Sequence, residues 1–444
     1  MRRSVNLLLL LFFICQVVFA VFSYALVDPN LVISSHPIYW QFQNWMWQTF
    51  FHNSVLLTQT YLLIVTIWFV IFLWIITLLR REKISDLVFK PEMIVGYLLL
   101  IFPMLLAYNA LSHDVFNYIF NAKMVMVYHV DPHQAVALDY AADDWTRFMH
   151  NTHTPAPYGY GWTIVSVLPF LLGGGKFMTT WLAFRLISLL SLSGLLWVLQ
   201  LLAKSWLHQP LKLWQLSLVF LNPLLIIEVL GNSHNDLWMM VPAAGAMWCL
   251  TQINNFNKAS LKWLLLAVMA FFLSVSIKYA TLVLLPLLLL IMMEKVVMLN
   301  LRHKIRFGLF NLIPEKAQQY VINWVDEKLI KYLPLFASMF MFLPLLTLRS
   351  QQFHPWYLIW PLIWLPLIKT AWWRQLLLVF SISSLWRYAP WLLQGGYEGE
   401  VLFYQKLITW LPAGLYLFYL LGKRSKSQKN HPQKVLPLLK AMES

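Results

Sequence analysis

The stretch VLLTQTYLLIVTIWFVIFLWIITLL, from Val55 to Leu79, determines the class of fold. It contains no Asp, Glu, Lys or Arg. At a rise of about 1.5 Å per residue, it is long enough to cross a hydrocarbon core about 30 Å thick. The rest of the chain is similar, since 60% of its 444 residues are hydrophobic and 11% are charged, whereas soluble domains contain about 25% charged residues. The sequence therefore predicts an all-α polytopic membrane protein.

Apolar segments of suitable length recur along the chain, so residues 1–444 are expected to form a single transmembrane domain with about 12 transmembrane helices. The predicted spans are 5–27, 55–79, 93–110, 177–203, 213–230, 236–251, 263–278, 280–293, 333–349, 357–371, 375–392 and 402–422. The first of these has a longer apolar run than the core of a secretory signal, which has about 7–15 residues. We expect a retained helix here, with a cleaved signal as the alternative.

The basic residues predict which side of the membrane each loop faces. The chain has 33 Lys and Arg residues and a formal net charge of +15. If the N-terminus is inside, most of these residues fall in cytoplasmic loops, as the positive-inside rule requires. Their spread over short loops argues against a nucleic-acid partner. We expect a multi-pass plasma-membrane protein with both termini cytoplasmic, a cytoplasmic amphipathic segment at 294–332 and a basic cytoplasmic tail at 423–444.

The long loop 111–160 is predicted to face outside, because its Asp residues outnumber its only basic residues, Lys123 and Arg147. The apolar run 162–172 is too short to cross the bilayer and is followed by three glycines, so an interfacial or re-entrant helix is expected there. Together, residues 111–176 are predicted to form an outer catalytic loop with interfacial helices. The GGGK string at 173–176 is not a phosphate-binding loop, because neither Ser nor Thr follows Lys176.

Polar and titratable side chains gather at the predicted outer ends of the spans. Taken singly, a loop aspartate is usually solvated, and a basic side chain near a helix end can reach the headgroups. An ionisable group inside a span, such as Glu228, is costly and is by default a functional candidate. The predicted substrate-binding set is His113, Asn117, Asp131, Tyr158, Glu228, His234, Asn235, Asp236 and Tyr357. Their convergence on one face of the membrane predicts a site there.

The outer face restricts the chemistry. No ready supply of nucleotide sugars or ATP exists outside the cell, so a transferase there needs a sugar carried by the membrane, as on a polyprenyl phosphate. A carboxylate must take the proton of the acceptor hydroxyl, and Asp114, directly after a predicted span, fits that role. Cations or hydrogen-bond donors must stabilise the leaving phosphate. The predicted donor-phosphate ligands are Lys278, His354, Arg387 and Arg349.

Five motifs in order carry a family resemblance. They are SHDVFNYIFNAKMVMVYHVDPH from Ser112, TPAPYGYGW from Thr154, LNPLLIIEVLGNSHND from Leu221, IKYATLVLLP from Ile277 and HPWYLIWP from His354. The chain resembles the GT-C superfamily of multi-pass glycosyltransferases. It is most similar to the polyprenyl-phosphate-mannose-dependent α-(1→6)-mannosyltransferases of bacterial cell-envelope synthesis.

The resemblance implies an inverting hexosyltransferase that moves mannose from a polyprenyl-phosphate carrier to a glycan or glycolipid acceptor, with Asp114 as the catalytic carboxylate. It implies no certain cofactor. Some GT-C members use a divalent metal (Mg²⁺ or Mn²⁺) and others do not, and Asp114 would be the ligand here. Two positions depart from the expected motifs, with Tyr160 in place of proline and His133 in place of tyrosine. These departures bear on sugar and acceptor identity rather than on reaction class.

A transporter or flippase for a lipid-linked sugar is the main alternative, because it would also have many spans and charged groups within them. A transporter is expected to place those groups at the bilayer midplane and in related halves. Here they lie at one interface, which favours the transferase. A purely structural membrane scaffold is the remaining alternative.

Overall fold

The computed structural model describes residues 2–81, 86–90, 92–255, 257–303, 320, 330–346, 353–396 and 398–430. Within these residues every regular element is helical, apart from an isolated bridge between Val88 and Lys212. The longer helices are α1 (Arg2–Ser23), α2 (Pro37–Met46), α3 (Ser54–Leu79), α4 (Met93–Ile101), α5 (Asp114–Met126), α6 (Tyr160–Leu172), α7 (Phe177–Leu207), α8 (Leu213–Phe220), α10 (Asp236–Thr251), α11 (Lys258–Ile277), α12 (Leu285–His303), α14 (Ile330–Phe340), α16 (Ala371–Trp386) and α18 (Glu400–Asn430). The all-α prediction is confirmed.

Short elements join these helices. They are η1 (Tyr24–Leu26), η2 (Pro29–Leu31), η3 (Trp47–Phe51), η4 (Phe102–Leu106), η5 (Ala137–Tyr140), η6 (Asp144–Phe148), α9 (Pro223–Ile226), η7 (Ile227–Gly231), η8 (Tyr279–Leu284), η11 (Leu343–Leu346), η13 (Pro355–Leu358), α15 (Ile359–Leu362) and α17 (Ala389–Gln394). Of these, η3 and η7 are π-helical. The helix α2, between the first two predicted spans, was not anticipated from the sequence.

Six of the described helices are long and apolar enough to cross a membrane, or seven if a bent pair counts as one span. That pair is α8 with Pro223–Gly231, which bends by 50°. The bend lies at Asn222-Pro223, within the predicted span 213–230, where proline removes a backbone donor and the Asn222 side chain caps α9. Length and composition thus support a polytopic membrane protein. They do not by themselves reach twelve spans.

The expected span 357–371 is not a continuous helix, so that prediction is corrected. After η13 and α15 the chain runs through turns to Leu367. Pro361 and Pro366 explain the interruption, because each lacks the N–H that a helix needs. The segment is nonetheless buried from Leu358 to Ile368, so it forms part of the core.

Two predicted segments and one predicted site residue fall largely or wholly on residues that the structure leaves undescribed. These are most of 294–332, Arg349, and the tail beyond residue 430. The run 162–172 is confirmed as a short helix, α6, of 13 residues. Gly174 and Gly175 follow with positive φ angles, which glycine adopts at little cost.

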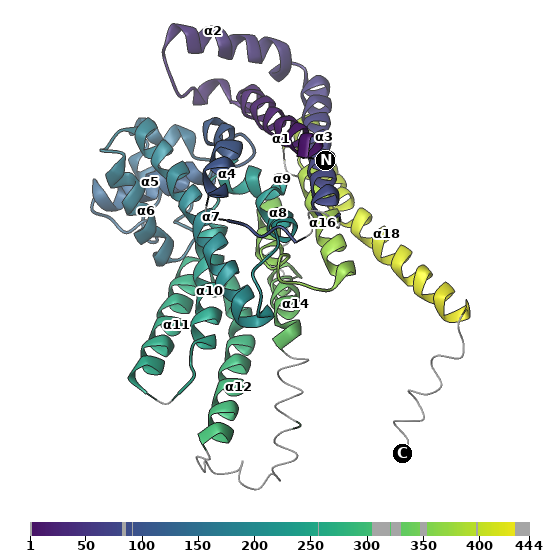
Figure 1. The fold of residues 1–444 in the computed structure, drawn as a ribbon. Coiled ribbons are helices and arrows are strands. Elements are labelled where there is room, and N and C mark those ends of the chain that lie inside the picture. Colours follow the sequence, from purple (N-terminus) through teal and green to yellow (C-terminus); the bar gives the residue numbers. More distant parts are fainter. Residues whose placement is uncertain are drawn as a thin grey trace.

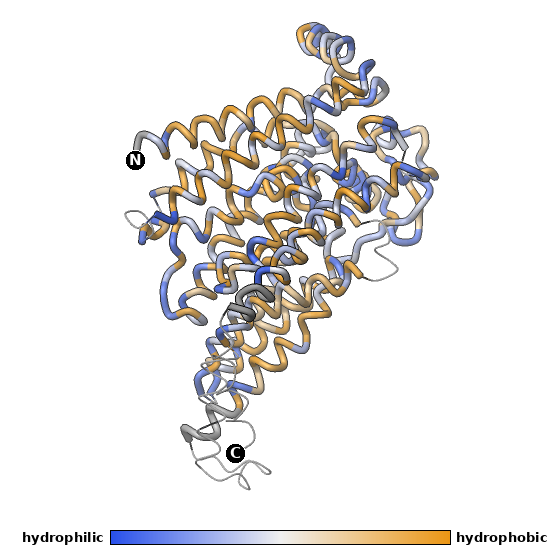
Figure 2. Tube along the Cα trace, turned by 90° about the vertical axis from the view of Figure 1, so that its right-hand side faces the viewer, coloured by the Kyte–Doolittle hydropathy of each residue, from blue (hydrophilic) through white to orange (hydrophobic). Residues whose placement is uncertain are grey.

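The helices pack into one bundle whose two ends differ (Figure 1). α10 packs against α7 and α11, α1 against α3, and α16 against α18. The helices α2, α5 and α6 lie toward the upper end of the view, whereas α11 and α12 extend toward the lower end (Figure 1). Figure 2 shows apolar residues along the helices and polar ones mainly at the ends of the bundle and in a band inside it.

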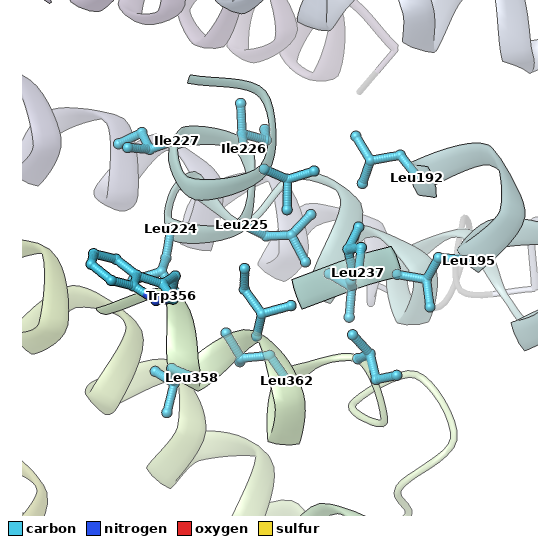
Figure 3. Packing of buried hydrophobic residues seen from close by; sticks show 14 of the residues in the cluster. Leu192, Leu195, Leu224, Leu225, Ile226, Ile227, Leu237, Trp356, Leu358 and Leu362 are labelled. Carbon is cyan, nitrogen blue, oxygen red and sulfur yellow. The ribbon is translucent and has the colours of Figure 1, made fainter. Parts of the chain in front are cut away.

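A dense apolar core surrounds the bent segment after Asn222. Leu224, Leu225, Ile226 and Ile227 of α9 and η7 are fully buried. They pack among side chains of α7, α10, η13 and α15, including Leu195, Leu237, Leu358 and Leu362 (Figure 3). The bent segment after Asn222 is therefore held from several sides, which gives the residues that follow it a fixed position.

Candidate active site

Asp114 is the first residue of α5, a helix that packs against α6 and α7. The Ser112 hydroxyl accepts a hydrogen bond from the Asp114 backbone N–H at 3.4 Å. At a helix N-terminus the peptide dipoles favour a negative charge. The carboxylate is thus fixed by a helix end, as expected from its place after the apolar segment 93–110.

One oxygen of Asp114 makes all of its contacts. Oδ2 accepts hydrogen bonds from the Tyr158 hydroxyl at 2.7 Å and the Tyr118 hydroxyl at 3.5 Å, and lies 3.4 Å from Nδ1 of His234. Within the described part of the chain Oδ1 has no polar partner. Because the side chain is 20% exposed and lines two cavities, Oδ1 is the oxygen left to accept a proton from a bound molecule.

The PYGYGW motif brings Tyr158 to this carboxylate. A Cβ on Gly159 would lie 1.9 Å from the Ser276 carbonyl oxygen, and a Cβ on Gly161 would lie 2.1 Å from the Ser276 hydroxyl oxygen. The Gly159 N–H also donates to the Ile277 carbonyl at 3.0 Å. The two glycines therefore allow the motif to pack directly against the end of α11, beside Lys278.

Lys278 occupies the break between α11 and η8 in an extended conformation. Its ammonium group donates to Oδ1 of Asp236 at 2.9 Å and lies 5.5 Å from the centroid of the Tyr158 ring. The Trp360 indole N–H donates to the same Asp236 oxygen. Asp236 is fully buried and Lys278 is largely buried, so this ion pair joins the starts of α10 and η8.

The GNSHND motif forms a sharp turn between η7 and α10. Ser233 has a φ angle of 57°, which is uncommon for a residue with a side chain. The His234 N–H donates to the Glu228 carbonyl at 3.0 Å. Nε2 of His234 lies 3.3 Å from the Glu228 carboxylate, which also accepts hydrogen bonds from Asn232 at 2.8 Å and Tyr388 at 2.9 Å. This turn therefore carries a fully buried His between two carboxylates.

Three rings stack beside the carboxylates. The His234 ring stacks on Trp356 with centroids 4.0 Å apart, and Trp356 stacks on His354 at 4.3 Å. Trp356 and His354 come from the HPWYLIWP motif. The stack thus ties that motif to the turn that holds His234.

Arg185 of α7 connects the segment before Asp114 with the segment before His234. Its guanidinium donates to the Ala107 carbonyl at 2.6 Å, to Oδ1 of Asn109 and to the Leu230 carbonyl. It is 1% exposed. Because charge-assisted hydrogen bonds are the stronger ones, Arg185 holds the chain before Asp114 close to the chain before His234. The alternative that it reaches the headgroups is not supported.

The electrostatics follow from these contacts. Burial alone would raise the pKa of Asp114, but the contacts and charge of His234, the Tyr158 hydroxyl and the Lys278 charge lower it below its usual range. Burial alone would lower the pKa of His234, but Asp114 and Glu228 raise it to about 9. Burial lowers the pKa of His354 to about 4. At neutral pH Asp114 is therefore ionised, His234 is positively charged and His354 is neutral.

Two cavities meet at Asp114. The smaller cavity, of about 300 Å³, is lined by Ser112, His113, Asp114, Asn117, His150, Asn151, His354, Trp356, Arg387, Tyr388 and Gln405 together with Leu111 and Pro355. The larger cavity, of about 540 Å³, is lined by Asp114, Tyr158, Lys278, His354, Trp356, Tyr357 and Trp360, with apolar residues such as Ile277, Val283 and Leu343. Asp114, His354 and Trp356 belong to both walls.

The structure brings together most of the predicted residues. His113, Asn117, Tyr158, Lys278, His354, Tyr357 and Arg387 line one or both cavities, and Glu228, His234 and Asp236 lie directly behind them. Asn235 is buried, and neither side-chain polar atom has a hydrogen-bond partner in the described residues.

Three predicted residues, Lys278, Arg387 and Asp131, are not arranged as expected. Lys278 and Arg387, expected to bind one phosphate, line different cavities. Asp131 lines neither cavity; it accepts hydrogen bonds from the Tyr160 hydroxyl at 2.8 Å and the His133 N–H at 2.9 Å. The His133 and Tyr160 rings are 3.9 Å apart, so the two positions that depart from the expected motifs contact each other.

Several contributors were missed from the sequence. Tyr118, Tyr388, Gln405, Trp356 and Trp360 contact or surround the charged groups. For the two tryptophans a signal existed, because they lie inside the HPWYLIWP motif. Tyr388, between α16 and α17, and Gln405 of α18 are distant in the sequence, and no motif marks them.

Asp114 is the residue expected to ligate any divalent metal. In the ranges that the structure describes, no three His, Cys, Asp or Glu side chains are arranged to hold a metal ion. Oδ2 of Asp114 is already occupied by the two tyrosine hydroxyls and His234. The described residues alone therefore do not supply three ligands for a metal ion at Asp114.

Comparison with known proteins adds a family. The family model described as "Alpha-(1->6)-mannopyranosyltransferase, N-terminal domain" matches residues 18–294, more than half of the chain. The match includes Asp114, Glu228, His234, Asp236 and Lys278, but not His354 or Arg387. A stretch of 145 residues is 28% identical to Alpha-(1->6)-mannopyranosyltransferase A of Mycobacterium tuberculosis (strain ATCC 25618 / H37Rv), covering 31% of this chain and 26% of that protein. The match thus spans about a quarter of the curated relative, and no solved structure matches.

Proposed function

The chain belongs to the alpha-(1→6)-mannopyranosyltransferase family, and we propose that it transfers mannose from a polyprenyl-phosphate carrier to a glycan or glycolipid acceptor with inversion. The observation that carries the proposal is the position of Asp114 in the walls of two cavities at once. A transferase that joins two bound molecules needs its base at the point where they meet. Family membership supports mannose as the sugar.

The larger cavity suits a lipid-linked donor. Its lining combines apolar residues, among them Ile277, Val283 and Leu343, with the Lys278 ammonium group. An isoprenoid chain would contact the apolar residues and its phosphate would meet Lys278, with the neutral His354 as a further hydrogen-bond donor. Asp236 accepts a hydrogen bond from the ammonium group, and the Trp360 indole donates to the same Asp236 oxygen.

The smaller cavity suits a sugar acceptor. It is lined by His, Asn, Gln, Tyr and Arg side chains, which match the hydroxyl groups of a glycan. Nδ1 of His113 and Oδ1 of Asn117 are buried and have no hydrogen-bond partner in the described residues. Because buried polar atoms are normally paired, these two atoms are suited to bind acceptor hydroxyls.

The proposed reaction is a single displacement. The acceptor oxygen forms a bond to the anomeric carbon of mannose, while the bond between that carbon and the phosphate oxygen breaks. The phosphate leaves with the electron pair and is stabilised by Lys278. Oδ1 of Asp114 takes the acceptor proton. Attack from the side opposite the leaving group inverts the anomeric carbon.

The proposed location is the outer face of the plasma membrane, with both termini cytoplasmic. The support is the basic bias of the loops and the absence of nucleotide sugars outside the cell. A reporter that is active only in the cytoplasm should give signal after Lys423 and none within 135–150. The opposite pattern would contradict the topology and the reasoning about the donor.

The activity test is direct. The purified protein in nanodiscs is incubated with radiolabelled polyprenyl-phosphate mannose and an α-mannan acceptor, and labelled glycan is measured. Transfer by the wild type, absent in Asp114→Asn, is the expected result. A transporter would instead move the labelled lipid across proteoliposomes without forming a glycosidic bond, and that outcome would overturn the proposal.

A further inference from the structure

We infer that His234 is a positioning residue, because it bridges the reactive carboxylate of Asp114 and the buried carboxylate of Glu228. The inference rests on the proposed function, because it concerns the same Asp114. His234 does not line either cavity. It therefore acts through Asp114 and has no contact with a substrate in either cavity.

The geometry of the bridge is specific. Nδ1 of His234 lies 3.4 Å from Oδ2 of Asp114, and Nε2 lies 3.3 Å from Oε2 of Glu228. The histidine and glutamate side chains are fully buried. Stacking on Trp356, with an interplanar angle of 21°, fixes the plane of the ring. Each nitrogen thus lies close to one carboxylate oxygen in an ion-pair contact, although neither ring N–H is aligned as a hydrogen bond among the described residues.

The charge of the ring follows from its two neighbours. A neutral imidazole carries no charge to offset either carboxylate, whereas an imidazolium attracts both at once. Two buried carboxylates without a cation between them would repel each other. The arrangement of carboxylate, imidazolium and carboxylate therefore satisfies both acids with one positive charge.

The bridge also explains how Asp114 can remain a useful base. An imidazolium paired with Asp114 alone would make that carboxylate less basic. Glu228 competes for the same proton donor and is itself held by Asn232 and Tyr388. When Oδ1 of Asp114 takes the acceptor proton, Asp114 becomes neutral and the imidazolium stays paired with Glu228. No buried charge is then left without a partner.

Other charged groups also face Asp114, and any pH dependence includes them. Tyr118 and Tyr158 donate to it, the Lys278 charge lowers its pKa, and His113, His150 and His354 titrate within its field. Arg387 lies on the smaller cavity. The test therefore compares variants of His234 with variants at a histidine outside this group.

The test uses His234→Gln, Glu228→Gln and the control His52→Gln, each in full-length protein in nanodiscs. His52 is exposed at the end of η3 and lines neither cavity. Infrared titration follows protonation of Asp114, assigned by comparison with Asp114→Asn. Removing the cation raises the pKa of Asp114, so its ionised form is lost at a higher pH. In His234→Gln we expect Asp114 protonation and the acid limb of kcat to move up by at least one pH unit, with KM values within about threefold of wild type.

In Glu228→Gln the imidazolium pairs with Asp114 alone, so kcat should fall about tenfold without an upward move of the acid limb. His52→Gln should leave both the titration and kcat unchanged. Wild-type titration of Asp114 in His234→Gln, or a shift equal to that in His52→Gln, would overturn the inference. The infrared measurement needs no substrate, so it tests the bridge even if the wild type transfers no mannose.

Discussion

The two cavities that meet at Asp114 share three lining residues but differ in the others. The smaller one is bounded by His113, Asn117 and Gln405, which offer neutral hydrogen-bonding groups, with the single guanidinium of Arg387. The larger one combines the Lys278 ammonium with apolar side chains of η8 and η11. The comparison indicates that one carboxylate can contact both a polar and a largely apolar molecule, because each cavity has its own lining residues that determine what binds there.

The largest expected effect is at the shared wall. Asp114→Asn keeps the volume of the side chain and removes its charge, so transfer should fall by about 10²–10⁴-fold, while folding and membrane insertion persist. Labelled glycan formation in nanodiscs measures the rate. Asp131→Asn is the matched control, since Asp131 lines neither cavity and should retain full activity. Comparable activity in both variants would show that Asp114 is not the base.

A second prediction separates the cavities. Lys278→Met removes a charge-assisted hydrogen bond worth about 1.5–3 kcal/mol, so kcat/KM for the lipid-linked donor should fall by about 10- to 100-fold.

Arg387→Met is the counterpart on the smaller cavity, and it should weaken the acceptor instead. Donor saturation curves measured at fixed acceptor, and the reverse, distinguish the two. If Arg387→Met weakens the donor as much as Lys278→Met does, both cations bind one phosphate, and the division between the cavities is wrong.

A third prediction concerns the glycines behind Tyr158. Gly161→Ala places a Cβ 2.1 Å from the Ser276 hydroxyl oxygen, so α6 must move away from α11 and shift Tyr158 and Lys278. We expect about a tenfold loss in donor kcat/KM, since small misplacements of positioned groups are costly. Gly245→Ala in α10 is the control, because nothing lies within 4 Å of its Cβ. Equal activity in the two variants would contradict the close packing described for the motif.

The smallest expected effect concerns the acceptor side. Asn117→Leu removes a buried amide whose Oδ1 has no partner in the described residues, so thermal stability should stay the same or rise. The acceptor KM should increase by about fivefold to tenfold, as for one neutral hydrogen bond of about 1 kcal/mol. Thermal unfolding and acceptor titration give the two readouts. A loss of stability with an unchanged KM would assign Asn117 to the fold instead.

Much of this arrangement was predictable from sequence because it depends on local pattern. An apolar run such as 55–79 has one stable solution in a bilayer, a helix with its backbone hydrogen bonds satisfied internally. The motifs around Asp114, Tyr158, His234 and Lys278 each begin or end a helix, so their clustering at one end followed from the expected threading.

The remainder depends on tertiary contacts that no pattern encodes. Residues 357–371 were expected to span because they are apolar, but Pro361 and Pro366 break the helix and burial satisfies the apolar side chains. The placement of Lys278 and Arg387 on different cavities depends on where α11 and α16 end relative to Asp114. Glu228 was a candidate as a buried charge, but its pairing with Tyr388 joins residues far apart in the chain.

The shared wall at Asp114, His354 and Trp356 has a kinetic consequence. A base that lies between two binding sites, and that forms no bond to the sugar, can complete a turnover only while both sites are filled. Initial velocities measured against both substrates should therefore give intersecting rather than parallel double-reciprocal lines.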